Sequence, residues 1–263
     1  MTAVLTARSN RPHASGSNSI PLRSFAMPRQ PFLPTYEEKP YSVGYFSLDS
    51  KPEFAKLIGL CIGVWSYVDN EIGTMFGLLL GMQSQAALEV FLSLRRASNQ
   101  RDALSAAAKH RLDGETKLAF DAVMILYKSL ESQRNDLAHG CFGTIENIDD
   151  ALLWIKIEHH VHFMADAITT EGRGMFRADR HELLKRNMFV YKLKDIEQLY
   201  SDMKECWNAA FNFNGWLRHS TSSVFPQIGS QMFAQLCALP QIRREMDRLR
   251  ENQEDTLAEN SPA

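Results

Sequence analysis

Apolar residues recur at helical spacing between residues 57 and 79. They follow one face of a helix and comprise Leu57, Ile58, Cys61, Ile62, Trp65, Val68, Ile72, Met75, Phe76 and Leu79. Pro52 and Glu53 suit the first turn of this helix, and Ser50 can cap it. The pattern therefore predicts a long helix from about Pro52 to Gly81.

The same spacing continues in later parts of the chain. It predicts helices at residues 84–111, 115–133, 194–218 and 227–252. The helix at 194–218 is rich in aromatic residues, which at this spacing normally fill a protein core. We therefore predict a mainly α fold.

After Gly140 the pattern changes from helical to strand-like. Residues 142–145 and 152–157 are short, apolar and separated by an acidic turn. Runs of this kind predict two strands joined as a small β-hairpin, inserted at about residues 142–162.

A histidine-rich stretch, residues 158–162, continues the second predicted strand. In that register Glu158, His160 and His162 share one face, an arrangement that can bind a metal ion. The ligand set is incomplete, so we expect no metal ion there and no other cofactor.

Composition divides the chain into three parts. Residues 1–45 are rich in Ser, Pro, Arg and Asn, and residues of this kind bury too little apolar surface to offset chain entropy. We predict a flexible N-terminal tail at 1–45, a helical domain at 46–225, and a C-terminal helix with a disordered end at 226–263.

The charge balance argues against strong binding of nucleic acid by bulk electrostatics, because the formal net charge is -2. A local basic patch remains on the predicted helix at 84–111, where Arg95, Arg96 and Arg101 lie close together. Such arginines most often form a solvated helix face, and the alternative is a weak contact with RNA phosphates.

Other features indicate a soluble protein of the cytoplasm. The most apolar window, residues 57–81, is interrupted by Asp69, Asn70 and Glu71, so it predicts a buried helix rather than a membrane span. No secretory signal is visible at the N-terminus. Four cysteines without metal-ligand spacing are expected to be reduced and mostly buried, namely Cys61, Cys141, Cys206 and Cys237.

The heptapeptide Arg134-Asn-Asp-Leu-Ala-His-Gly140 concentrates reactive side chains at the end of the helix predicted from residue 115. Arg134 continues the apolar face of that helix, so we expect it to be half-buried with its head group directed towards a partner. On a straight helix Arg134 and His139 lie about 140° apart. Gly140 can adopt the left-handed conformation that ends helices. A bend at Gly140 or a second subunit would therefore be needed to bring the two side chains together.

Asp69 lies on the apolar stripe of the first predicted helix, four residues after Trp65. A carboxylate in such a place requires a cationic or hydrogen-bonding partner unless it reaches water. The sequence leaves these two alternatives open.

Arginine and histidine together suit the cleavage of RNA by its own 2′-hydroxyl group. An imidazole transfers protons near neutral pH, and a guanidinium binds phosphate through paired charged hydrogen bonds. Arg134, Asn135 and His139 form a minimal set, because an amide can orient the imidazole or bind the phosphate. By spacing alone this signal is weak.

The Arg-Asn-x-x-x-His sequence at residues 134–139, after a long amphipathic helix, resembles the signature of HEPN-domain proteins. The sequence Trp65-Ser-Tyr-Val-Asp69 is a second point of resemblance, because bacterial HEPN-like proteins often carry an aromatic followed by an acidic residue there. The resemblance implies a bundle of four to five helices, a homodimer whose two motifs face each other, and Asp69 as an ion-pair partner of Arg134.

The resemblance also implies a function. Many HEPN proteins are metal-independent endoribonucleases that act in defence or RNA processing and leave a 2′,3′-cyclic phosphate, sometimes under the control of a partner protein. In that role His139 is the general acid or base and Arg134 stabilises the phosphorane. Asn135 positions one of these two side chains. The alternative is a non-catalytic HEPN-like module that binds nucleotides or other proteins.

Overall fold

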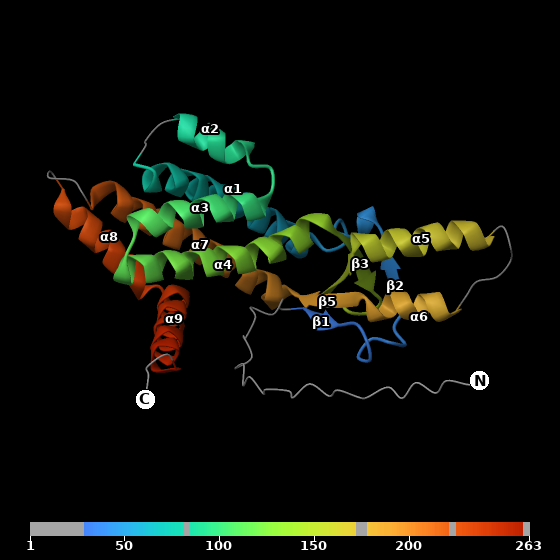
Figure 1. The fold of residues 1–263 in the computed structure, drawn as a ribbon. Helices are drawn as coiled ribbons and strands as arrows, with labels where there is room; N and C mark the ends of the chain where they lie inside the picture. The colour runs from blue at the N-terminus through green and yellow to red at the C-terminus, as the bar shows by residue number, and fades with distance from the viewer. Residues whose placement is uncertain (1–28, 82–84, 172–177, 221–224, 260–263) are drawn as a thin grey trace, which may run out of the picture.

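A computed structural model describes residues 29–81, 85–171, 178–220 and 225–259. Within these residues the chain is mainly helical, as the sequence predicts, and carries a small antiparallel sheet. The helices lie at one end and the sheet at the other, and two further helices project beyond the sheet (Figure 1).

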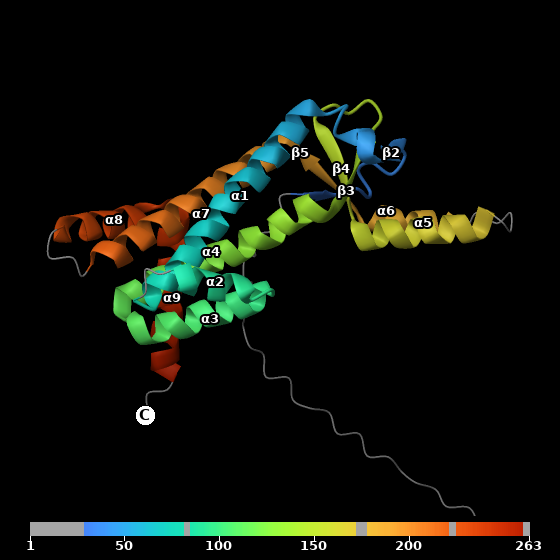
Figure 2. The same cartoon turned by 90° about the horizontal axis from the view of Figure 1, so that it is seen from above.

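The helices begin and end at the following residues: α1 at Pro52–Leu79, α2 at Gln85–Ser93, α3 at Ala97–Arg111, α4 at Gly114–His139, α5 at Ile157–Glu171, α6 at Ala178–Arg186, α7 at Leu193–His219, α8 at Pro226–Ala238 and α9 at Pro240–Glu259. A short 3-10 helix, η1 at Tyr45–Ser47, precedes α1. The long helices α1, α4 and α7 converge on the sheet, and α2 and α3 lie against the side of this group (Figure 2).

Several helix boundaries differ from the sequence prediction. The helix expected at 84–111 is interrupted between α2 and α3, because Arg96 takes an extended conformation. The segment expected as one helix at 227–252 divides at Pro240, whose ring cannot continue a helix. Helix α9 then runs on to Glu259 through residues expected to be disordered. Ser50 does not cap α1, because its hydroxyl donates to the carbonyl of Ser47.

The strands are β1 at Gln30–Pro31, β2 at Tyr41–Val43, β3 at Gly140–Ile145, β4 at Ala151–Lys156 and β5 at Met188–Lys192. They form an antiparallel sheet in the order β1-β5-β4-β3-β2. The predicted hairpin is therefore the centre of a larger sheet. Strand β5 was not predicted, although its alternating run of Met, Phe, Val, Tyr and Lys carries a strand signal.

Both edge strands come from residues that the composition assigned to a flexible tail. Strand β1 pairs with β5 and β2 pairs with β3. Between them Phe32 and Tyr36 are buried under the sheet at 0% and 7% exposure. The prediction of a tail at 1–45 is therefore wrong from residue 29 onwards, and residues 1–28 lie outside the described part of the chain.

Both faces of the sheet are covered by apolar groups. On one face Leu152, Trp154 and Tyr191 join the large core formed by α1, α4 and α7. On the other face alternate residues of β4 and β5 pack with Phe32 and Tyr36 in a smaller core. This alternation follows from the two-residue period of a strand.

The histidine-rich stretch at 158–162 is helical. Strand β4 ends at Lys156 and α5 begins at Ile157, so Glu158, His160 and His162 do not share the face expected from a strand. The five residues are too few for their periodicity to separate a strand from a helix. Among the described residues no group of three or more potential ligands gathers in a metal-binding arrangement.

All four cysteines are free thiols. Cys61 and Cys206 are buried, and Cys141 and Cys237 are partly buried. Burial raises the pKa of Cys61 to about 12. The thiolate is therefore disfavoured at this position, in agreement with an inert core cysteine.

The junction between α4 and β3 is packed against Trp154. A Cβ atom at Gly140 would lie 2.7 Å from Cε2 of Trp154 and closer still to its Nε1. The indole is 1% exposed, and its Nε1 donates to the carbonyl of Asp136 at 2.8 Å, so it cannot move aside. Gly140 is required by this close approach.

We expect Gly140→Ala to lower the free energy of unfolding by about 1–3 kcal/mol, because the added methyl group overpacks the junction. Gly63→Ala is a matched control, since a Cβ at Gly63 in α1 meets no atom within 4 Å. That substitution should be neutral or stabilise the protein by about 0.5–1 kcal/mol through helix propensity. Urea denaturation of both variants tests this, and equal effects would contradict it.

Candidate active site

The heptapeptide ends α4 and begins β3. Helix α4 is continuous through His139, so it contains no bend between Arg134 and His139. Gly140 has φ -82° and ψ 154°, which is extended rather than left-handed. The expected left-handed end is therefore wrong, and the glycine serves the packing of Trp154 instead.

Arg134 is directed towards α1. Its Nη2 lies 3.6 Å from Oδ2 of Asp69, and its guanidinium carbon lies 5.6 Å from the centre of the Trp65 ring. The side chain is 26% exposed. Its Nε is buried and has no hydrogen-bond partner among the described residues. The half-buried position expected from the sequence is thus found, and the partner is Asp69.

Asp69 is held from two sides. Besides Arg134, it accepts a hydrogen bond from the Tyr127 hydroxyl at 3.2 Å, and Tyr127 stacks on Trp65 with ring centres 5.3 Å apart. Its side chain is nevertheless 46% exposed. The two alternatives that the sequence left open are therefore combined, because this carboxylate is both paired and in contact with water.

The pKa of Asp69 lies above its ordinary value of 3.8. Desolvation raises the pKa of Asp69, whereas the charge of Arg134 and the hydrogen bond from Tyr127 lower it, and the net shift is upward. Glu131 lies one helical turn before Arg134. Desolvation raises its pKa too, and the charge of Arg101 opposes this shift.

Arg101 takes part in this network rather than in a free basic patch. It forms an ion pair and a hydrogen bond with Glu131 of α4. Arg95 and Arg96 are exposed at the break between α2 and α3, so the three arginines do not share one helix face. The sequence did not identify Glu131 or Tyr127, although both lie on α4 within two turns of Arg134.

Asn135 and His139 are exposed on α4. Their side chains form no hydrogen bond or ion pair with any described residue. No contact joins Arg134 to His139 in the described part of the chain, because an unbroken helix keeps them about 140° apart. The structure therefore brings Arg134 together with Asp69 but leaves Asn135 and His139 separate from that pair.

Asp136, also part of the motif, is directed towards the sheet. Its carboxylate lies 3.3 Å from Nη1 of Arg29, and its carbonyl accepts the hydrogen bond from Trp154. Desolvation raises the pKa of Asp136, and Arg29 opposes the shift. Sequence reasoning missed this contact because Arg29 lies in a segment without apolar periodicity and far from residue 136.

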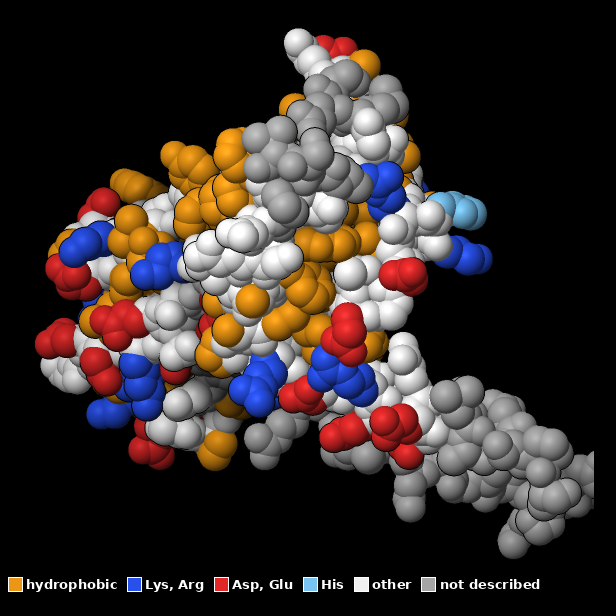
Figure 3. Space-filling model, turned by 90° about the vertical axis from the view of Figure 1, so that its left-hand side faces the viewer, with side chains coloured by type: hydrophobic (Ala, Val, Ile, Leu, Met, Phe, Trp, Pro, Cys, Tyr) orange, Lys and Arg blue, Asp and Glu red, His pale blue; other side chains and the backbone are white. Residues whose placement is uncertain are grey.

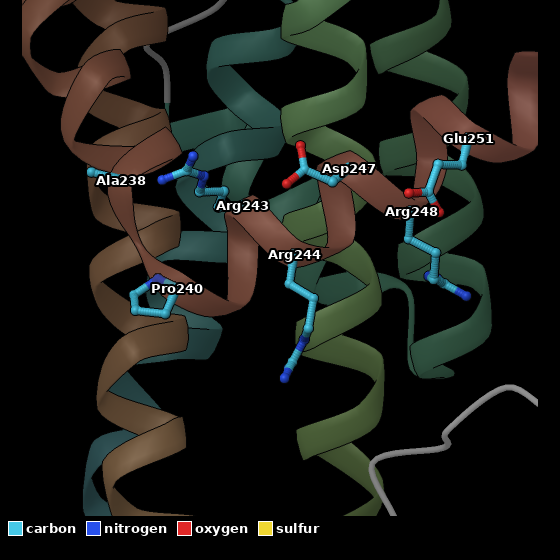
Figure 4. Close-up of a pocket in the computed structure, with 7 residues that line it drawn as sticks. All are labelled: Ala238, Pro240, Arg243, Arg244, Asp247, Arg248 and Glu251. Atoms are coloured by element: carbon cyan, nitrogen blue, oxygen red, sulfur yellow. The ribbon is translucent and has the colours of Figure 1, made fainter.

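Two other surface features lie away from the motif. A hollow along α9 is lined by charged side chains that include Arg243, Arg244 and Asp247 (Figure 4). Helix α9 pairs through Arg250 with Glu115, about 28 Å along α4 from Arg134. Apolar side chains also gather on the end of the molecule opposite the sheet (Figure 3).

Comparisons with protein-family models, with curated proteins and with solved structures give no match to this chain. Of the helices that the structure describes, none combines the length and the hydropathy needed to cross a membrane. The chemistry of the motif itself is therefore the basis for assigning a function.

The raised pKa of Asp69 predicts a pH dependence of stability. Between the ordinary pKa of 3.8 and the raised value, the folded protein keeps a proton that the unfolded chain has lost. Below the ordinary pKa of Asp69 the folded protein has the whole of the stabilisation that this proton provides. The stabilisation is lost as the pH rises through the raised pKa of the folded state. From about pH 4 upwards, wild type should therefore lose stability relative to Asp69→Asn.

Glu115→Gln is the control for this experiment. The hydrogen bond from Arg250 lowers the pKa of Glu115, so wild type should gain stability relative to this variant as the pH rises. Urea denaturation at a series of pH values measures both differences. The same sign for the two variants would contradict the assignment.

Proposed function

We propose that this protein is a metal-independent endoribonuclease of the HEPN type, which cleaves RNA through attack of the 2′-hydroxyl group on the adjacent phosphate. The observation that carries the proposal is the placement of Arg134, Asn135 and His139 on the last turns of one helix, with Arg134 anchored and the other two exposed. The mainly helical fold is compatible with a HEPN-like bundle.

Arg134 is the group that stabilises charge in this proposal. Its guanidinium is oriented by Asp69 and by the Trp65 ring, so little side-chain entropy is lost when it binds a phosphate. Both side chains of the pair are partly exposed. A phosphate can therefore approach the guanidinium while Asp69 keeps it oriented.

His139 supplies proton transfer. Its exposed position at the end of α4 leaves the imidazole accessible to a nucleic acid chain. As general base it removes the proton from the 2′-hydroxyl, and as general acid it protonates the departing 5′-oxygen. The products are a 2′,3′-cyclic phosphate and a free 5′-hydroxyl group. Asn135 binds the phosphate or orients the imidazole.

The divergence of Arg134 and His139 on an unbroken helix supports a site shared between two copies of the chain. With two copies face to face, the His139 of one lies beside the Arg134 of the other, and the two imidazoles divide the acid and base roles. For this reason we propose a homodimer with RNA as its substrate. The resemblance to HEPN proteins adds the proposal of a further protein that regulates the site, and the sequence adds that of a cytoplasmic location.

The cleavage assay uses purified protein, mixed cellular RNA and EDTA. We expect wild type to release fragments that end in cyclic phosphate. His139→Ala should lower the rate by about 100-fold or more, because proton transfer is lost. Arg134→Ala should cause a comparable loss, because the phosphorane is no longer stabilised.

His110→Ala is the matched control, since His110 is also an exposed histidine in the last turn of a helix, α3. It should cleave at the wild-type rate. Equal cleavage by wild type and His139→Ala would overturn the catalytic assignment, as would equal losses in the two histidine variants.

The second candidate is a non-catalytic HEPN-like module that binds nucleotides or proteins. One observation favours it, namely that the charge of Arg134 is already balanced by Asp69 within the same chain. In this case Arg134 is a structural residue that ties α4 to α1, and wild type leaves RNA intact.

A double-mutant cycle of Arg134→Ala and Asp69→Ala measures the structural role. Because the pair is partly exposed, we expect a coupling of about 1 kcal/mol in the free energy of unfolding. Purely additive effects would show that Arg134 does not stabilise the fold through Asp69. Together with the cleavage assay, the cycle separates the two candidate functions.

A further inference from the structure

The contacts of Asp136 form a clamp between the end of α4 and the sheet. The clamp consists of Arg29, Asp136, Trp154 and Phe189. The guanidinium carbon of Arg29 lies 4.0 Å from the ring centre of Trp154 and 4.4 Å from that of Phe189. Its Nη1 lies 3.3 Å from the Asp136 carboxylate. The side chains of Arg29 and Asp136 are only 16% and 20% exposed.

The clamp holds Asp136 by both of its oxygen-bearing groups. Arg29 binds the carboxylate, and the indole of Trp154 binds the main-chain carbonyl at 2.8 Å. This carbonyl is one of the last four of α4, which have no partner within the helix. The same indole contacts Gly140, so the path of the chain from His139 into β3 is fixed on two sides.

Arg29 itself is held in place by the strand that follows it. Pro31 of β1 pairs with Phe189 of β5, and the amide of Phe32 donates to the carbonyl of Met188. Phe32 is fully buried on the opposite face of the sheet. On one face of the sheet the segment therefore packs through Phe32. On the other face Arg29 binds the end of α4.

The location of the clamp relates it to the candidate site. Asp136 follows Asn135 directly and lies between Arg134 and His139 on the same turns of α4. Arg134 is directed towards α1, whereas Asp136 is directed towards the sheet. A rotation or fraying of the last turn would displace His139 relative to Arg134, and the clamp opposes both movements.

We propose that Arg29 is a positioning residue, which acts through Asp136 to fix the last turn of α4 and with it the geometry of Arg134, Asn135 and His139. The effect on cleavage rests on the proposed function, whereas the effect on the helix end does not. The side chain of Arg29 is largely buried against Trp154, Phe189 and Asp136, so we assign it to the turnover step rather than to substrate binding.

The test compares the full chain with Arg29→Ala, Arg29→Lys and Asp136→Asn. Amide hydrogen exchange reports local opening at residues 137–141, and we expect it to be about tenfold faster in Arg29→Ala because a charged, stacked contact is lost. Arg29→Lys should lie between this variant and wild type, since lysine keeps the charge but not the planar stacking. In a protein that already carries Asp136→Asn, the further change Arg29→Ala should accelerate exchange at residues 137–141 less than it does in wild type. Both substitutions remove the same contact.

Arg250→Ala is the matched control. Arg250 also pairs with a carboxylate of α4, Glu115, but at the opposite end of the helix. This variant should leave exchange at residues 137–141 unchanged. In the cleavage assay, Arg29→Ala should lower kcat by about tenfold with little change in KM, because misplacement of catalytic groups affects the reaction and not the binding of RNA.

Four results would decide the proposal. Unchanged exchange at residues 137–141 in Arg29→Ala overturns it, and so does an equal acceleration throughout α1 and α7, which shows global destabilisation. Faster local exchange with an unchanged kcat overturns the role in catalysis. Faster local exchange in a protein whose wild type cleaves no RNA supports the clamp and overturns the proposed function.

Discussion

The contact between Trp154 and the end of α4 is the constraint on which the site depends. One indole binds the carbonyl of Asp136, packs on Gly140 and forms a surface for Arg29. Because it is buried in the large core, it cannot adjust to changes in any one of these partners. The direction in which α4 meets the sheet is therefore set by a single aromatic side chain. The orientation of every residue of the motif depends on that junction.

The motif uses different sides of one helix for different purposes. Arg134 is anchored on α1, Asp136 is anchored on the sheet, and Asn135 and His139 remain exposed. The anchored side chains restrict the rotation of α4, so the exposed ones have a defined direction without contacts of their own. This division is compatible with the proposed site that a second copy of the chain completes.

The sequence predicted the long helices well because their apolar residues repeat over many turns, as in α1 and α7. The place of Asp69 on an apolar stripe indicated either a partner or contact with water, whereas Arg134 was named as that partner only through the resemblance to HEPN proteins. Short segments were harder. Five residues at 158–162 did not distinguish a strand from the start of α5, and the break before Arg96 leaves no proline or glycine as a signal.

The contacts of the N-terminal segment could not be predicted, because they are not local. Arg29 and Phe32 lie among polar residues and prolines, and neither belongs to a periodic pattern. Their burial depends on a surface that exists only after β4 and β5 have paired. Composition therefore indicated a tail where tertiary structure provides two strands.

The position of these edge strands has a consequence for the order in which the protein is assembled. Gln30 pairs with Val190, so β1 is synthesised long before the strand that it accompanies. The packing of α3 against α4 involves residues that are close in the sequence. By contrast, the pairing of β1 with β5 must close a loop that contains most of the domain. Helices α1 to α4 can thus form while the chain is still being made, but the end of α4 receives its support from the sheet only after β5 has emerged.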